Sequence, residues 1–510
     1  MTSRTPSSLD SRRRFLRQLG ALGASTTAAP WLANLASLTP AHAAGANDYK
    51  ALVCLFLNGG NDPYNTVVPT DSSSWANYLA ARNSGTDPLA LQPAGAPKQK
   101  TSPSYNARLG GVLPIAPRNP QGRTYALHPQ LAAVQALFAS GRVAVVSNVG
   151  TLVGPTSKAA YLANAVPLPP KLFSHNDQAS VWQSFGPEGT AVGWGGAMAD
   201  LRASANTQAI FSSISTNGSA VWSDGRNVQP YQLGLQGPIA IGNNTPGNTL
   251  FTSAAAQAAL LQMMRTTRED QVAEAEHAAV VGRSVDANNV LSPAMPIANM
   301  LPWGTPNLPP GAIDPLLTYI APDSGQATLN PITAQLQPIA RMIAARAALG
   351  MGRQVFFVGV DGWDTHDTQN IRHADLLAQL AQAMSYWDNV TRTMGVDGNV
   401  TTFTASDFGR SFASNDDGTD HGWGSHHFVM GGAVKGGDLY GTFPAYGAAD
   451  GVGGFTSPDQ LTDGVLLPST SVEQYAATLG RWFGLSDAEL AQVLPNLANW
   501  SVKDLGFMAA

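Results

Sequence analysis

Four stretches of the chain are almost continuously apolar and rich in β-branched or aromatic residues. They lie at residues 51–57 (ALVCLFL), 142–150 (RVAVVSNVG), 354–360 (QVFFVGV) and 399–405 (NVTTFTA). Short runs of this kind are typical of strands that are buried on both faces of a parallel sheet. The sequence therefore predicts a central, mostly parallel sheet.

Segments with apolar residues at helical spacing alternate with these strands. They cover residues 128–140, 332–349, 367–394, 471–483 and 488–494. Strand, helix and strand in this order predict right-handed crossover connections and an α/β fold.

Two regions interrupt this pattern with Ser, Gly, Pro and Asn. They lie at residues 71–125 and at about 190–325, and we expect both to be loop-rich insertions. The C-terminal helices are expected within 470–505. We therefore expect residues 44–510 to form a single domain.

Polar side chains with metal-binding chemistry follow the predicted strands. They are Asp62; Ser174 with His175; Asp361, Asp364 and His366; Asp407; and, just beyond, His421, His426 and His427. Because the carboxyl ends of parallel strands meet at one edge of a sheet, these side chains are expected to gather there. Carboxylates mixed with imidazoles favour Zn²⁺, Mn²⁺ or iron, whereas Ca²⁺ prefers oxygen ligands. The pattern predicts a metal site.

Several of these residues also have a structural interpretation. Asp62 could form an Asx-turn or cap a helix instead of binding metal. Ser174 fits a helix cap, or a nucleophile at a helix N-terminus beside a metal. Arg410 could hold a substrate oxyanion, or pair with Asp407 or Asp420 and order the loop. Asp420 could also orient a ligand histidine.

The first 43 residues have the pattern of a twin-arginine export signal. Residues 11–17 read SRRRFLR, a weakly apolar run covers 19–38, and Ala41-His42-Ala43 offers a cleavage site. Gly, Ser, Thr and Pro interrupt the apolar run, so no stable membrane span is expected. We expect a bacterial protein that uses the twin-arginine export machinery and is periplasmic or secreted.

The charge of the remaining chain argues against nucleic acid as a partner. Without residues 1–43 the chain has 29 − 5 = 24 basic and 34 − 1 = 33 acidic side chains, a net charge of about −9. Binding to phosphate backbones needs a basic surface. Cys54 is the single cysteine, so no intrachain disulfide can form, and its apolar surroundings predict a buried core residue.

Several longer motifs resemble the DUF1501 family of exported bacterial proteins. They include LFLNGGNDPYNTVVP, SHNDQASVWQSF, GVDGWDTHDTQ, TASDFGRSF and GTDHGWGSHHFVMGG. The family is similar in pattern to the alkaline phosphatase and sulfatase superfamily. That likeness implies an alkaline-phosphatase-like three-layer αβα sandwich with one or two metal ions. The Asp and His ligands favour Zn or Mn for these ions, with Ca or Fe as further options.

The resemblance also assigns roles to particular residues. Asp62, Asp407 and His421 match metal ligands of the superfamily, Asp364 with His366 matches an Asp-and-His ligand pair, and Ser174 falls near the superfamily's nucleophile. Phe408 stands where the superfamily often has a ligand histidine. His426, together with His427 and His175, is available to replace that ligand. The spacing of Asp364 and His366 also departs from the superfamily's pattern, so a one-metal or degenerate site is an alternative.

These observations imply an exported metal-dependent hydrolase of phosphate or sulfate esters. Its substrate would be a small-molecule or polymer ester, with Ser174 or a water molecule as nucleophile and Arg410 as an anion-binding group. The alternative is a non-catalytic exported binding protein with a degenerate metal site. A third hypothesis is an iron enzyme built on two histidines and one carboxylate.

Overall fold

The computed structural model describes residues 48–238, 250, 253–266, 272–298, 300–305 and 314–509. All of them belong to one compact unit, Ala46–Ala510. The predicted export signal, residues 1–43, lies outside the described residues. Among the helices of the described residues, none is both long enough and apolar enough to cross a membrane.

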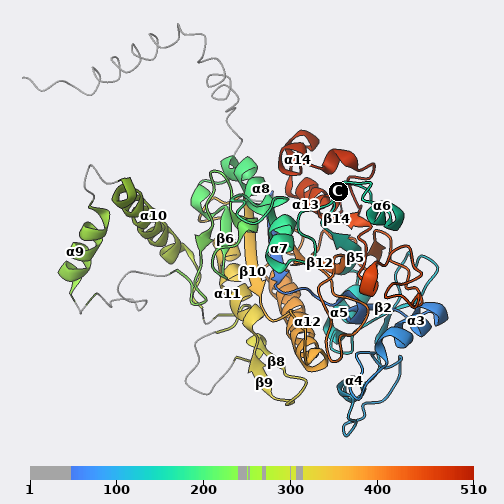
Figure 1. The fold of residues 1–510 in the computed structure, drawn as a ribbon. Helices are drawn as coiled ribbons and strands as arrows, with labels where there is room; N and C mark the ends of the chain where they lie inside the picture. Colours follow the sequence, from blue (N-terminus) through green and yellow to red (C-terminus); the bar gives the residue numbers. More distant parts are fainter. Residues whose placement is uncertain are drawn as a thin grey trace, which may run out of the picture. The chain divides into compact units, whose positions relative to one another are not determined.

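A sheet of nine strands forms the centre of the described fold, in the order β13-β5-β12-β11-β1-β10-β6-β7, with β14 paired to β5 (Figure 1). Its long strands are β1 (Lys50–Leu57), β5 (Val143–Gly150), β10 (Arg353–Val360) and β11 (Val400–Ser406). β1 lies between β10 and β11 and is parallel to both. The predicted α/β class with a mostly parallel central sheet is therefore confirmed.

One strand of this sheet runs against the others. β12 (Ser425–Met430) pairs antiparallel with both β11 and β5. The remaining strands, β6 (Ser213–Ser215), β7 (Tyr231–Gln232), β13 (Leu439–Tyr440) and β14 (Thr470–Ser471), are short and parallel to their neighbours. Because of its direction, β12 begins at the sheet edge where β11 and β5 end.

Helices cover both faces of the sheet (Figure 1). Along β1, Val53 and Leu55 face a core that contains α5 (Ala132–Ala139), α11 (Pro331–Ala344) and α12 (Gln369–Thr393). The alternate residues Cys54 and Phe56 face a second core. That core contains α7 (His175–Ser184), α8 (Trp194–Arg202), α13 (Val472–Phe483) and α14 (Asp487–Val493). Successive side chains of a strand point to opposite faces, so continuous apolar runs are buried on both sides. Cys54 is buried, as predicted.

The two loop-rich regions contain regular elements. Residues 71–125 hold α3 (Ser72–Arg82), α4 (Tyr105–Leu109) and β3 (Leu113–Ile115), and β3 joins β4 (Tyr125–Leu127) and β2 (Val67–Pro69) in a small sheet. α6 (Lys158–Leu162) follows β5. The region near 190–325 supplies α8, β6 and β7 to the central layers, and also contains α9 (Ala254–Arg265), α10 (Val272–Ala294), β8 (Thr318–Ile320) and β9 (Ala327–Leu329).

Candidate metal site

The loop after β10 presents Asp364 and His366 at the carboxyl edge of the sheet. Between β10 and the pair, Trp363 is fully buried, and its backbone N–H donates to the Asn58 carbonyl at 3.1 Å. Thr365 is also buried, and its hydroxyl donates to Gln369. Because the residues alternate between buried and accessible positions, Asp364 and His366 are left on the accessible side.

A third side chain, His421, joins this pair from the loop before β12. The Asp364 Oδ1 atom lies 3.1 Å from His366 Nε2 and 3.3 Å from His421 Nε2, and the two Nε2 atoms are 3.0 Å apart. All three ligand atoms lie within 4.8 Å of one another. Atoms bound to one ion at about 2.0–2.2 Å lie roughly 3 to 3.6 Å apart, so this spacing suits a shared metal ion.

The outer nitrogens of both histidines lie near oxygen atoms of neighbouring residues. His421 Nδ1 lies 2.9 Å from the Phe173 carbonyl, and a carbonyl can only accept, so Nδ1 carries the proton. His366 Nδ1 lies 3.3 Å from Asp420 Oδ1, where a second-sphere carboxylate was expected. With its proton on Nδ1, His421 turns the lone pair of Nε2 toward Asp364. This lone pair, His366 Nε2 and the Asp364 carboxylate oxygen converge on one point, which is the chemistry of a metal site.

Arg410 holds the carboxylate of this triad in place. Its side chain is fully buried, and Nη1 donates to Asp364 Oδ1 at 2.7 Å and to the Gly59 carbonyl at 3.0 Å. The other guanidinium nitrogens donate to Thr419. Although partial burial acts to raise the pKa of Asp364, the hydrogen bond and charge of Arg410 hold that pKa below its ordinary value. Arg410 thus orders the loop through Asp364, and not through Asp407 or Asp420.

Asp407 lies at the end of β11 and outside the triad. Its Oδ2 accepts from Gly59 N at 2.8 Å and lies 2.7 Å from His175 Nδ1. Burial raises the pKa of Asp407 despite this contact, and the contact with Asp407 raises the pKa of His175. His175 is the first residue of α7, is 43% exposed, and has its ring centre 6.1 Å from that of His421. An aspartate–histidine pair therefore borders the triad.

Asp62, a predicted metal ligand, is fully occupied by hydrogen bonds and an ion pair within the protein. It caps the 3₁₀ turn Pro63–Asn65 by accepting from Tyr64 N at 3.0 Å. Arg82 of α3 contacts both of its oxygens, at 2.5 and 3.1 Å, and Gln369 donates to it at 2.6 Å. Both charged side chains are fully buried. The structure therefore places Asp62 in a structural ion pair, outside the triad.

His426 and His427 lie within β12, where the side chains alternate between the two faces of the sheet. Both are buried, and burial lowers the pKa of each to about 3. The His426 ring stacks on Phe443, and the His427 ring on Tyr475. The structure places both in the core as neutral rings, away from the triad.

Ser174 is the N-cap residue of α7, but its side chain does not cap the helix backbone. Its hydroxyl donates to Asp177 Oδ2 at 2.7 Å. The preceding residue, Phe173, supplies the carbonyl that accepts from His421. Ser174 therefore lies beside the site, with its hydroxyl hydrogen directed to a carboxylate.

Three groups that shape the site and its surroundings were not predicted from the sequence. The Phe173 carbonyl leaves no trace in side-chain patterns, and Arg82 lies in a region that we expected to be a loop-rich insertion. Gly59 did carry a signal, because the Asn58-Gly59-Gly60 turn was visible in the sequence. Its φ is +120°, and a Cβ at this position would lie 2.2 Å from Asp364 N. Only glycine allows this close approach between the loops after β1 and β10.

The fold and site together define an α/β protein with a candidate metal centre of two histidines and one aspartate. The chain belongs to the DUF1501 family, described as "Protein of unknown function (DUF1501)", whose model matches residues 49–497. No curated protein sequence matches the chain. One similar solved structure is a sulfatase from a Bacteroides thetaiotaomicron locus for the metabolism of multiple glycosaminoglycans. It has 10% sequence identity and a TM-score of 0.31, and the match covers 88% of this chain and 74% of that one. A likeness this distant carries no argument about activity.

Proposed function

We propose that this protein is an exported, divalent-metal-dependent hydrolase of phosphate or sulfate esters. The observation that supports it is the convergence of Asp364, His366 and His421, whose ligand atoms all lie within 4.8 Å of one another. A Zn²⁺ or Mn²⁺ ion held there would supply Lewis acidity for the developing charge of an ester oxygen. The ester class itself comes from the resemblance to the alkaline phosphatase and sulfatase superfamily.

The neighbouring side chains can move protons near this centre. His175 is oriented by Asp407 at 2.7 Å, and its ring remains partly accessible. It is therefore placed to give a proton to a leaving group or to take one from a nucleophile. The nucleophile would be a water molecule or the Ser174 hydroxyl. Asp177 already accepts the hydrogen of that hydroxyl, which favours Ser174 as a nucleophile.

The test combines metal analysis with hydrolysis assays. The protein is purified, its metal content is measured, and aryl phosphates and aryl sulfates are screened with added Zn²⁺ and Mn²⁺. We expect Asp364→Ala and His421→Ala to lose both the metal and the activity. Asp367→Ala, an exposed carboxylate paired with Arg372, is the matched control and keeps both. A protein that hydrolyses the esters equally well without metal, or that binds no metal, contradicts the proposal.

A second candidate function is favoured by the donor set itself. Two histidines and one carboxylate are the ligands of many non-haem Fe(II) oxygenases. Metal identity separates the two functions: stoichiometric Fe(II) with oxygen consumption supports the oxygenase, and Zn²⁺ or Mn²⁺ with ester hydrolysis supports the hydrolase. A folded protein that binds metal and catalyses neither reaction supports the binding-protein alternative.

We also propose that the protein reaches its site of action through twin-arginine export. The support is the pattern of residues 11–17 followed by the Ala41-His42-Ala43 cleavage site. Replacing Arg12 and Arg13 together by Lys should retain the protein in the cytoplasm, as measured by cell fractionation. Unchanged export of this variant contradicts the proposal.

A further inference from the structure

The side chain of Gln369 is bonded to both loops that carry the triad, the loop after β10 (residues 361–368) and the loop before β12 (residues 407–424). Gln369 is the first residue of α12 and is fully buried. Its Oε1 accepts from the Thr419 hydroxyl at 2.6 Å and from the Thr365 hydroxyl at 3.2 Å. Thr365 lies between the two ligands of the first loop, and Thr419 lies two positions before His421. A single amide oxygen therefore joins the two loops.

The orientation of the Gln369 amide is fixed by Asp62. Gln369 Nε2 donates to Asp62 Oδ2 at 2.6 Å, and a carboxylate can only accept. The opposite orientation would place the amide oxygen against a buried carboxylate, so Oε1 is directed at the two threonines. An asparagine at position 62 can still accept from Nε2, so Asp62→Asn keeps this orientation.

The two loops come from distant parts of the chain and approach each other closely. Thr419 N donates to the Thr365 carbonyl at 3.2 Å. A Cβ on Gly418 would lie 2.2 Å from the His366 carbonyl oxygen. Metal sites tolerate deviations of only about 0.2 Å in the distances to their ligands. A small shift between the loops would therefore separate His421 Nε2 from the other two ligand atoms, which lie 3.0 and 3.3 Å from it.

Thr419 also links Gln369 to the carboxylate of the triad. Its Oγ1 donates to Gln369 and accepts from Arg410 Nε at 3.0 Å, and Arg410 Nη1 donates to Asp364 Oδ1 at 2.7 Å. Gln369, Thr365 and Thr419 are at most 1% exposed, so water cannot replace a lost bond unless the loops open.

We propose that Gln369 is a positioning residue of the candidate metal centre. It holds the loop after β10 and the loop before β12 at the separation at which the three ligands of the triad share one ion. This inference rests on the metal site of the proposed function. It assigns to Gln369 no contact with the ion or with a substrate.

The first test measures the metal affinity of Gln369→Met, which keeps the length of the side chain and removes its hydrogen bonds to Asp62 and the two threonines. We expect this variant to bind Zn²⁺ about 10- to 100-fold more weakly in a chelator competition. The matched control is Gln379→Met, ten residues or about 15 Å further along α12. Gln379 is also buried, and its Nε2 donates to Asp375 at 2.7 Å. This control should bind Zn²⁺ as tightly as the wild type.

The second test needs no metal. Hydrogen–deuterium exchange is followed by mass spectrometry on protein stripped with a chelator, in peptides that cover both loops. Gln369→Met should speed the exchange of the Thr419 N–H, which donates to the Thr365 carbonyl, by about tenfold. Gln379→Met should leave the exchange rates of both loops unchanged.

Three results would overturn the proposal. They are wild-type exchange rates in both loops of Gln369→Met, wild-type Zn²⁺ affinity in that variant, and an equal loss of affinity in Gln379→Met. If Gln369→Met does not fold, Thr365→Val takes its place, because it removes only the bond to Gln369. It should weaken Zn²⁺ binding and speed exchange in the same loops, and wild-type values for both would overturn the proposal.

Failure of the proposed function gives a different result. A wild-type protein that binds no metal contradicts the hydrolase. Faster exchange in the loops of metal-free Gln369→Met would then still support the positioning role of Gln369, and unchanged exchange would overturn it.

Discussion

Replacing Arg82 by Met tests whether Asp62 is a structural residue. Arg82 contacts both Asp62 oxygens, at 2.5 and 3.1 Å, and neither side chain is exposed. The substitution would leave a carboxylate buried with only neutral donors, the Tyr64 N–H and the Gln369 amide. Breaking a buried pair in this way costs about 3–5 kcal/mol of the free energy of unfolding.

This loss can be expressed as a change in melting temperature. An unfolding entropy of about 2.1 cal/mol/K per residue gives roughly 1 kcal/mol/K for a folded unit of the size of Ala46–Ala510. We therefore expect Arg82→Met to lower Tm by about 3–5 °C, measured by differential scanning calorimetry at pH 7. The control is Arg372→Met, which breaks an exposed pair with Asp367 and should lower Tm by less than about 1 °C.

The metal affinity of an Asp62 variant also tests whether Asp62 is a structural residue or a metal ligand. Because Asp62 lies outside the triad, Asp62→Asn should be less stable but should bind metal as tightly as the wild type. Loss of the metal from Asp62→Asn would refute a purely structural role for Asp62. An Arg82→Met variant that retains the wild-type Tm and binds an additional ion would refute it as well. Either result would make Asp62 a ligand, as its place after the first strand suggested.

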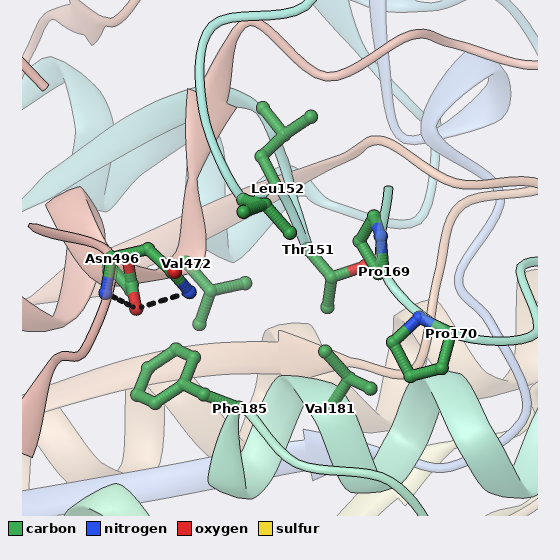
Figure 2. Close-up of a pocket in the computed structure, with 10 residues that line it drawn as sticks. Thr151, Leu152, Pro169, Pro170, Val181, Phe185, Val472 and Asn496 are labelled. Atoms are coloured by element: carbon green, nitrogen blue, oxygen red, sulfur yellow. Dashed lines mark hydrogen bonds between the residues drawn. The ribbon is translucent and has the colours of Figure 1, made fainter. Parts of the chain in front are cut away.

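Three further predictions concern the triad and Glu473, a buried residue of α13 whose carboxylate accepts hydrogen bonds from Asn496 (Figure 2). Asp420→Asn should weaken metal binding about 10- to 100-fold in a chelator competition, because Asp420 lies against His366 Nδ1. If the variant binds metal with wild-type affinity, Asp420 does not support the metal site. Gly59→Ala should displace Asp364 and abolish metal binding, whereas Gly398→Ala, with nothing within 4 Å of the added Cβ, should not. Glu473 has a folded-state pKa of about 7 and an ordinary pKa of 4.5, so the native state binds its proton more tightly, and the stability from Glu473 falls as pH rises through this range. Glu473→Gln lacks this titrating carboxyl group, so its free energy of unfolding relative to wild type should increase by up to about 3 kcal/mol between pH 5 and pH 8. This corresponds to an increase of about 3 °C in the Tm of the variant relative to the wild type. A relative Tm that is the same at both pH values would contradict this prediction.

Much of the fold could be predicted from local patterns. The four apolar runs became β1, β5, β10 and β11, and the helical segments after them became α5, α11, α12, α13 and α14. Such predictions succeed because burial on one or two faces imposes a period on the chain that neighbouring residues reveal. The antiparallel direction of β12 leaves no such mark, since strand direction depends on the path of the connecting loop.

The candidate site was predicted only in part. Asp364 and His366 are two positions apart on one loop, so their proximity follows from the chain itself. His421 was also named, but its ring reaches them only because β11 and β10 flank β1 in the sheet. Asp62 and His426 carry the same metal-binding chemistry as these ligands. In the structure, however, Asp62 forms an ion pair with Arg82, and His426 is buried in the core.

Local patterns along the chain define the helices and strands, the edge of the sheet where carboxylates and imidazoles lie, and the resemblance to the family. Only the folded structure shows which of those groups share a point in space and which are already paired. The physical reason is that side-chain chemistry is a property of each residue, whereas coordination and ion pairing depend on distances of about 3 Å between residues far apart in the chain. Those distances are set by strand order and by the packing of distant segments such as α3.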